Sequence, residues 1–162
     1  MTSFIQQSRP ILTTGVIELV GINELVADTN YSASVEIPID VNGQASGEIL
    51  SVLILAREVG SGAVLRSPGE LLLFDSDPTI ALNATALASL DIQKIIGNET
   101  FAVADYAVAD DLGDHAWKAV AIAFSNTKSL WATFRLASAT AINSAAGDDE
   151  TLELIMRYRR DS

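Results

Sequence analysis

Hydrophobic and polar residues alternate with a period of two along much of the chain. The alternation is plain in residues 32–37 and 131–136, and it returns in residues 151–159 near the C-terminal end. There, four large apolar side chains share one side of the segment: Leu152, Leu154, Met156 and Tyr158. Because successive side chains of a β-strand point to opposite faces, these segments predict strands with one buried face.

Longer apolar runs predict inner strands, among them a long central strand at residues 47–59. Residues 47–59 form one such run, which ends at Gly60-Ser61-Gly62, and residues 70–74 form another after the turn signal Pro68-Gly69. Shorter runs predict strands at residues 13–20, 101–104 and 116–124. The polar residues 125–129 then predict a hairpin loop that joins residues 116–124 to the next strand.

The sequence predicts one short helix, at residues 91–96, with Asp91 as its N-cap and Gly97 just after its end. About eight strands with turns between them are typical of an all-β protein. We therefore expect an antiparallel β-sandwich or jelly roll with one short connecting helix. Residues 1–11 lack the alternation and are expected to form an N-terminal arm, and residues 12–162 a single domain.

Composition and charge narrow the classes of partner. The chain of 162 residues has no cysteine, which excludes disulfides, thiolate metal sites and a cysteine nucleophile. Its formal net charge is −11, so its surface should repel nucleic acids and anionic membranes, and neither is an expected partner. The sequence shows no signal peptide and no apolar run long enough to cross a bilayer, which favours assembly inside a cell.

The stretch 71–79 has two interpretations. An apolar strand is followed by Asp75-Ser76-Asp77-Pro78-Thr79, which matches the D-x-D-x-T motif of haloacid-dehalogenase-type phosphotransferases, where the first aspartate attacks phosphorus. That chemistry needs a parallel sheet with crossover helices, whereas the chain predicts one short helix. Pro78 would also stiffen the loop that should wrap the phosphate. We therefore predict a buried strand that ends in a turn, where the aspartates bond nearby amides.

Other chemistry-bearing residues fall into patterns that do not match an active site. His115 follows Asp114 directly, and adjacent side chains on a strand cannot face each other as in a catalytic triad. Two acidic runs could offer oxygen ligands but lack the spacing of a calcium loop; they are Asp105, Asp110, Asp111 and Asp114, and then Asp148, Asp149 and Glu150. We expect no catalytic residue, no cofactor and no metal, and thus a protein that is not an enzyme.

Two groups of residues are candidates for contacts with partners. Trp117 and Trp131 lie on the two strands of the predicted hairpin, where they could pack in the core or a subunit interface, or bind carbohydrate or protein if exposed. The basic residues Arg157, Arg159 and Arg160 crowd the C-terminal end of a strongly acidic chain. They form either an exposed chain end or a contact with an acidic partner surface.

Four pieces of the sequence together resemble the small jelly-roll head-decoration (cement) proteins of tailed bacteriophages. These pieces are residues 48–52, 70–79, 90–97 and 151–154. The shared pattern is an apolar strand with aspartates and Pro-Thr, a short acidic helix that ends in Ile-Gly, and a leucine-rich closing strand. The N-terminal part of the chain matches in its alternation only, and the arginines after Leu154 depart from the pattern.

The resemblance implies a homotrimer on the capsid exterior of the virion, after assembly in the host cytoplasm. Such trimers sit at three-fold and quasi-three-fold sites and bridge subunits of the major capsid protein against the pressure of packaged DNA. The candidate capsid contacts are Phe4, Ile5, Arg9, Arg157, Arg159 and Arg160, and the candidate trimer-interface residues are Trp117 and Trp131. The alternative is a phage tail or receptor-binding β-sandwich that recognises host glycans.

Overall fold

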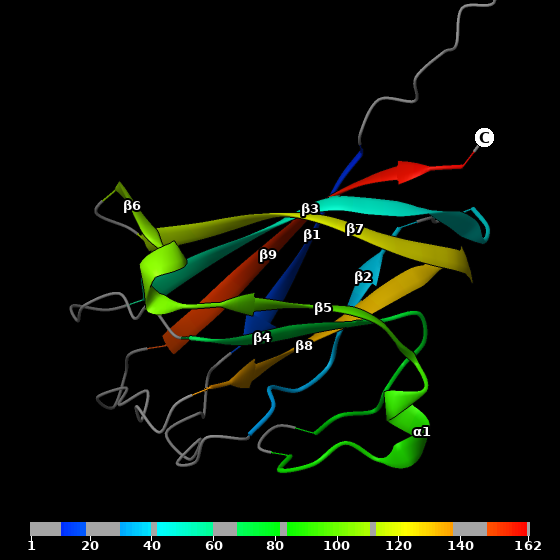
Figure 1. Ribbon diagram of the computed structural model, residues 1–162, viewed down its shortest axis with the longest axis horizontal. Helices are drawn as coiled ribbons and strands as arrows, with labels where there is room; N and C mark the ends of the chain where they lie inside the picture. The colour runs from blue at the N-terminus through cyan, green and yellow to red at the C-terminus, as the bar shows by residue number, and fades with distance from the viewer. Residues whose placement is uncertain are drawn as a thin grey trace, which may run out of the picture.

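The computed structural model describes residues 11–18, 30–39, 42–59, 68–81, 84–110, 113–137 and 149–161. These residues form two antiparallel sheets that pack face to face (Figure 1). Sheet A has the order β1 (Ile11–Glu18), β9 (Asp149–Arg160), β3 (Ala45–Val59), β7 (Gly113–Thr127) and β6 (Ala107–Asp110). Sheet B has the order β2 (Val35–Pro38), β8 (Ser129–Leu136), β4 (Gly69–Phe74) and β5 (Ile95–Phe101).

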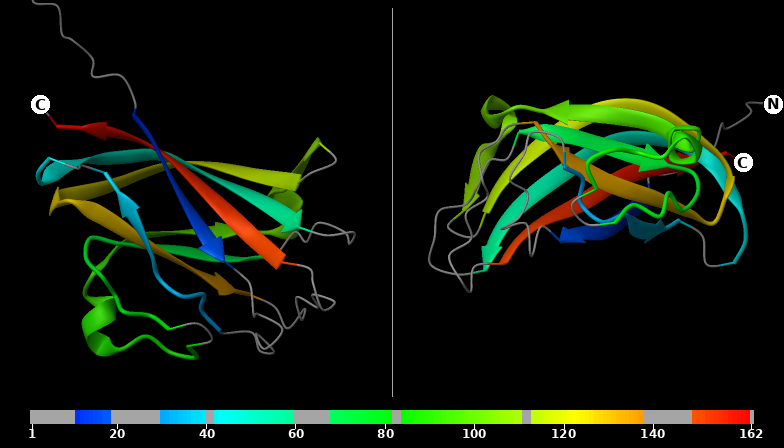
Figure 2. Two further views of the ribbon diagram at one scale, coloured as in Figure 1. Left: turned by 180° about the vertical axis from the view of Figure 1, so that it is seen from behind. Right: turned by 90° about the horizontal axis from the view of Figure 1, so that it is seen from below.

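This architecture confirms the predicted all-β sandwich. With the short edge strand β6 set aside, the orders β1-β9-β3-β7 and β2-β8-β4-β5 are those of a jelly roll. The two further views in Figure 2 show the two layers and the short helix α1 at one end of the molecule. The predicted central strand at residues 47–59 is β3, which lies in the middle of sheet A.

The predicted alternation builds the core between the sheets. On β9, the side chains of Leu152, Leu154, Met156 and Tyr158 are all buried, as the sequence predicts. Leu71 and Leu73 of β4 and Phe134 of β8 join the same cluster from sheet B. Burial of each large apolar side chain contributes about 1.5–3 kcal/mol, so this interior provides most of the stabilisation of the fold.

The predicted helix at residues 91–96 is wrong in its position. Helix α1 spans Ser89–Ile92 and begins after Ala88, so Asp91 lies in its first turn instead of capping it. Gly97 lies within β5, where it pairs with Leu73. A Cβ at Gly97 would approach the Ile122 side chain to 2.7 Å, so close packing between the sheets decides the conformation here. The contact between the two sheets therefore outweighs the local sequence signals that favoured the end of a helix at Gly97.

Two further predictions, on residues 101–104 and on Ile11, also need correction. The strand expected at residues 101–104 is the end of β5 followed by a 3-10 turn at Val103–Asp105 (η2). Ile11, which the sequence places at the end of the arm, is the first residue of β1 and pairs with Tyr158. The arm expected at residues 1–11 otherwise lies outside the described residues.

The predicted hairpin around residues 125–129 is wrong as well. Strand β7 pairs with β3 and β6, whereas β8 pairs with β2 and β4, so the chain crosses from one sheet to the other here. Asn126 has a φ of 54°, and the Thr127 hydroxyl donates to the carbonyl oxygens of Ser129 (2.6 Å) and Asp75 (2.9 Å). The polar residues thus extend β7 and then turn a corner, which polarity alone does not distinguish from a hairpin loop.

A second, smaller cluster covers one end of the outer face of sheet B. Leu72 and Phe74 of β4 point away from the main core and pack with Tyr31 and Ile80. Next to this cluster, the hydroxyls of Ser32 and Thr133 form a buried hydrogen-bond network with each other and with the backbone. The segment between β4 and β5 is thereby fixed onto sheet B, and it presents α1 at its end (Figure 1).

Candidate functional site

The residues Asp75 to Thr79 form a turn at the end of β4. The Thr79 amide donates to Asp77 Oδ1 (2.7 Å), and the Ser76 hydroxyl donates to Asp75 Oδ1 (2.9 Å). Lys94 Nζ donates to the Asp77 carbonyl oxygen, and Thr79 has a φ of 54°. The predicted bond to a nearby amide is confirmed for Asp77, whereas Asp75 accepts from a hydroxyl instead. Because β4 lies between antiparallel neighbours, the aspartates are not at the edge of the parallel sheet that D-x-D-x-T chemistry requires.

The other sequence candidates for catalysis or metal binding are separated by the fold. Asp114 is buried, and the adjacent His115 on β7 is half-buried on the opposite face. Within the ranges that the structure describes, no group of three or more histidines, aspartates and glutamates is placed to hold a metal ion. Asp111 and Asp148 lie outside those ranges.

Asp105 holds the 3-10 turn η2 against β7. Its Oδ2 accepts a hydrogen bond from the Ala102 amide (2.8 Å) and forms an ion pair with Lys118 Nζ (2.9 Å). Both contacts hold the pKa of Asp105 below its ordinary value, and the hydrogen bond from the Ala102 amide has the larger effect. Lys118 also lies 5.9 Å from the centre of the Phe101 ring. The carboxylate therefore has a structural partner on each side.

We expect the substitution Asp105→Asn to weaken the acid sensitivity of the fold. A carboxyl whose pKa is depressed in the folded state stabilises the protein above its unfolded pKa, and this stabilisation is lost as pH falls through the folded pKa. The difference in the free energy of unfolding between wild type and variant should thus be largest near neutral pH. It should shrink below about pH 4 in urea titrations run at several pH values. If the difference in the free energy of unfolding stays the same at every pH, the proposed stabilising role of the Asp105 carboxylate is wrong.

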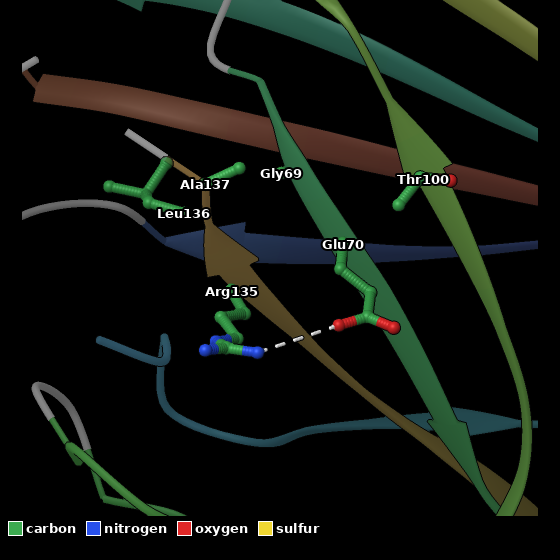
Figure 3. A pocket seen from close by; sticks show the side chains of 6 residues that line it. All are labelled: Gly69, Glu70, Thr100, Arg135, Leu136 and Ala137. Atoms are coloured by element: carbon green, nitrogen blue, oxygen red, sulfur yellow. Dashed lines mark ion pairs between the residues drawn. The ribbon is translucent and has the colours of Figure 1, made fainter. Parts of the chain in front are cut away.

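A small pocket lies at the other end of the outer face of sheet B (Figure 3). It has a volume of about 240 Å³ and is lined by Gly69, Glu70, Thr100, Arg135, Leu136 and Ala137. Arg135 lies 5.6 Å from the Tyr31 ring centre and 3.9 Å from Glu70 Oε2, and Glu70 Oε1 accepts from Asn98 Nδ2 (2.5 Å). The pocket thus combines one ion pair with the apolar side chains of Leu136 and Ala137.

The structure divides the arginines that the sequence groups together. All three belong to β9 rather than to a loose chain end. Arg157 is exposed, Arg159 pairs with Glu48 Oε2 (2.8 Å) on the outer face of sheet A, and Arg160 donates to the Ile39 carbonyl oxygen (2.5 Å). Of these three candidate capsid contacts, Arg157 and Arg159 therefore lie on the outer face of sheet A, and Arg160 does not. Phe4, Ile5 and Arg9 lie outside the described residues.

The two tryptophans also lie apart, because their strands belong to different sheets. Trp131 is half-buried in the second cluster on sheet B, where it already packs within its own chain. Trp117 is 59% exposed on the outer face of sheet A. Trp117 is therefore the tryptophan that remains available for a subunit interface or a ligand.

Helix α1 carries an exposed apolar tip that the sequence does not predict. Leu90 is 71% exposed and Ile92 is 55% exposed. Both residues lie near or within the predicted connecting helix, and nothing in that prediction indicates that their side chains are exposed. Two large apolar residues in a short polar segment were the available signal, since such residues are usually buried.

The chain matches no protein-family model and no curated protein. No helix among the described ranges is long and apolar enough to cross a membrane.

Proposed function

We propose that this protein is a structural virion protein that decorates the outer surface of a phage capsid. In this proposal it binds at three-fold and quasi-three-fold sites as a homotrimer and bridges subunits of the major capsid protein. The observation that carries the proposal is the exposure of large apolar side chains on opposite sides of a rigid sandwich: Trp117 on sheet A, and Leu90 with Ile92 beyond sheet B.

A bridging protein needs two separate binding surfaces on a body that does not deform. The jelly roll supplies the body, since its two sheets close over one continuous core. Exposed leucine, isoleucine and tryptophan gain about 25 cal/mol per Å² of apolar surface when a partner covers them. Attachment through several chains multiplies such modest contacts, because each bound chain raises the effective concentration of the next.

The charge of the chain fits an exterior position. A net charge of −11 repels released DNA and disfavours contact between decorated particles. In the proposal, the tip of α1 contacts the capsid, and Phe4, Ile5 and Arg9, which lie outside the described residues, stay candidate contacts. Arg157, on the opposite side, is then left for contacts between decoration proteins.

The proposal predicts that the purified protein binds matching, undecorated capsids and raises their melting temperature. The double substitution Leu90→Glu with Ile92→Glu should abolish at least about 90% of this binding, because it places two charges in the apolar contact. Binding is measured by co-sedimentation with capsids, and shell melting by calorimetry. Val103→Glu is the matched control, since Val103 is 50% exposed on η2 at the other end of the molecule.

Capsids that neither bind the protein nor gain stability would overturn the proposal. The second candidate is a tail or receptor-binding module for host glycans, and the exposed indole of Trp117 is the observation that favours it. A glycan array separates the two functions. Glycan binding that is lost in Trp117→Ala, together with no affinity for capsids, would support the second candidate.

A further inference from the structure

The pocket on the outer face of sheet B holds a cation and an anion that do not close into a tight salt bridge. Glu70 of β4 and Arg135 of β8 are directly opposite in register, and their side chains point toward one another (Figure 3). The Arg135 nitrogen Nη1 nevertheless lies 3.9 Å from Glu70 Oε2, which is beyond hydrogen-bond distance. A charge-assisted hydrogen bond between such groups is normally about 2.7–2.9 Å long. Both groups therefore keep capacity to bind a further partner.

A second cross-strand pair in the same fold shows the closed arrangement. Glu48 of β3 and Arg159 of β9 are also opposite in register, and their side chains meet at 2.8 Å. In this closed pair the arginine and the glutamate are 52% and 34% exposed, against 36% and 27% in the pocket. Because opposite charges attract more strongly where less water surrounds them, the pocket pair should be the tighter of the two. Its wider separation therefore has a cause in its surroundings.

Each charge of the pocket pair is held by another residue on its far side. The Tyr31 ring centre lies 5.6 Å from the Arg135 guanidinium, and a β-bridge joins the two residues. On the other side, Glu70 Oε1 accepts a hydrogen bond from Asn98 Nδ2 of β5 (2.5 Å). Tyr31 lies beside β8 and Asn98 lies on the strand beyond β4, so the two contacts hold the charges apart.

Arg135 is left with donors that its own chain does not use. Its Nε is buried and has no hydrogen-bond partner among the described residues, and its Nη1 is out of reach of Glu70. Buried polar groups in native proteins nearly always have a partner, so such an arginine marks a place where an acceptor is missing. The planar guanidinium matches the two oxygens of a carboxylate. Glu70 Oε2, which faces the arginine, is placed to accept from a cation.

We propose that this pocket binds a small apolar α-amino acid in its zwitterionic form. The ligand carboxylate accepts hydrogen bonds from Arg135, and the ligand ammonium donates to Glu70 Oε2. A simple anion would be repelled by the glutamate and a simple cation by the arginine, whereas a zwitterion matches both charges.

The size and the walls of the pocket set the class of side chain. Its volume of about 240 Å³ is below the range of about 300–1,000 Å³ that is usual for drug-sized ligands. Leu136 and Ala137 form an apolar wall next to the charged pair. A short aliphatic side chain fits this wall, while a charged side chain would lose its water there without gaining a partner.

This site is separate from the proposed capsid contact. The pocket and the apolar tip of α1 lie at opposite ends of the outer face of sheet B. Amino-acid binding is measured on the purified protein without capsids, and capsid binding is measured with the α1 variants. Each proposal can therefore fail without the other.

The first test titrates the isotope-labelled protein with L-alanine and follows the amide chemical shifts by NMR. Saturable shifts with a Kd of about 1 mM are expected at the pocket residues Gly69, Glu70, Thr100 and Arg135. N-acetyl-L-alanine lacks the ammonium and L-alaninamide lacks the carboxylate, so each should bind at least about 10-fold more weakly. No saturable shift up to about 20 mM L-alanine, shifts that fall elsewhere, or equal binding of either analogue would overturn the proposal.

Two variants then assign each charge to its part of the ligand. Arg135→Gln and Glu70→Gln should each weaken L-alanine binding at least about 10-fold. Arg135→Gln should bind L-alanine and L-alaninamide equally, and Glu70→Gln should bind L-alanine and N-acetyl-L-alanine equally, which a general loss of structure would not produce. Glu48→Gln is the matched control, since it opens the other cross-strand pair and should leave binding unchanged.

Circular dichroism of each variant checks that the fold is kept. If a variant does not fold, the comparison of the three ligands on the wild-type protein decides the case. A folded Arg135→Gln or Glu70→Gln protein that binds and discriminates as the wild type does would overturn the assignment.

Discussion

Truncation of Phe134 to alanine is expected to lower the free energy of unfolding by about 3–5 kcal/mol. Phe134 is 1% exposed in the main core, where it lies on β8 between the two sheets. The substitution removes the ring from a closely packed interior and leaves a cavity that the two sheets cannot close by a small movement. A loss of this size is a large part of the stability of an ordinary domain.

Chemical denaturation followed by tryptophan fluorescence or circular dichroism measures this loss. Leu90→Ala is the matched control, because it also shortens a large apolar side chain but at a position that is 71% exposed. We expect the control to change the free energy of unfolding by less than about 0.5 kcal/mol. Equal effects of the two substitutions would contradict the position of Phe134 in the core.

Replacement of Gly47 by alanine is expected to cost about 3 kcal/mol or more, although it adds a single methyl group. Gly47 lies in β3 opposite Arg160 of β9. A Cβ at this position would lie 2.0 Å from the Arg159 carbonyl oxygen and 3.0 Å from the Arg160 Cα. Both neighbours are backbone atoms, so no side chain can turn away, and the two strands must separate at this end.

Gly43 provides the control for this substitution. A Cβ at Gly43 has no neighbour within 4 Å, so Gly43→Ala should leave stability unchanged within about 0.5 kcal/mol or raise it slightly. The melting temperatures of both variants give the comparison. If Gly47→Ala has the same melting temperature as the wild type, the close pairing of β3 and β9 at Gly47 is wrong.

Alternation in the sequence was sufficient to predict the sandwich and most of its strands. The pattern of Leu152, Leu154, Met156 and Tyr158 placed one side of β9 in the core, because the period of two is a property of the strand itself. The apolar run at residues 70–74 gave an inner strand for the same local reason. The turn after it was predictable, since Asp77 bonds an amide only two residues away.

Predictions that depended on which strands become neighbours were wrong or incomplete. The polar residues 125–129 were assigned to a hairpin loop, yet β7 and β8 belong to different sheets. Residues 95–97 were assigned to a helix and its end, yet they belong to β5, which pairs with β4. In both cases the local signal was compatible with two structures, and the choice came from partners distant in the sequence.

The sequence by itself determined the class of fold, the core face of its regular strands, the acidic surface and the turn chemistry of Asp77. Each of these follows from residue type and spacing along a short segment. Only the tertiary structure decided that Trp117 is exposed while Trp131 is packed, and that Glu70 and Arg135 meet at one pocket. Surfaces are made of residues from strands far apart in the chain, and strand pairing is fixed by the packing of the whole core.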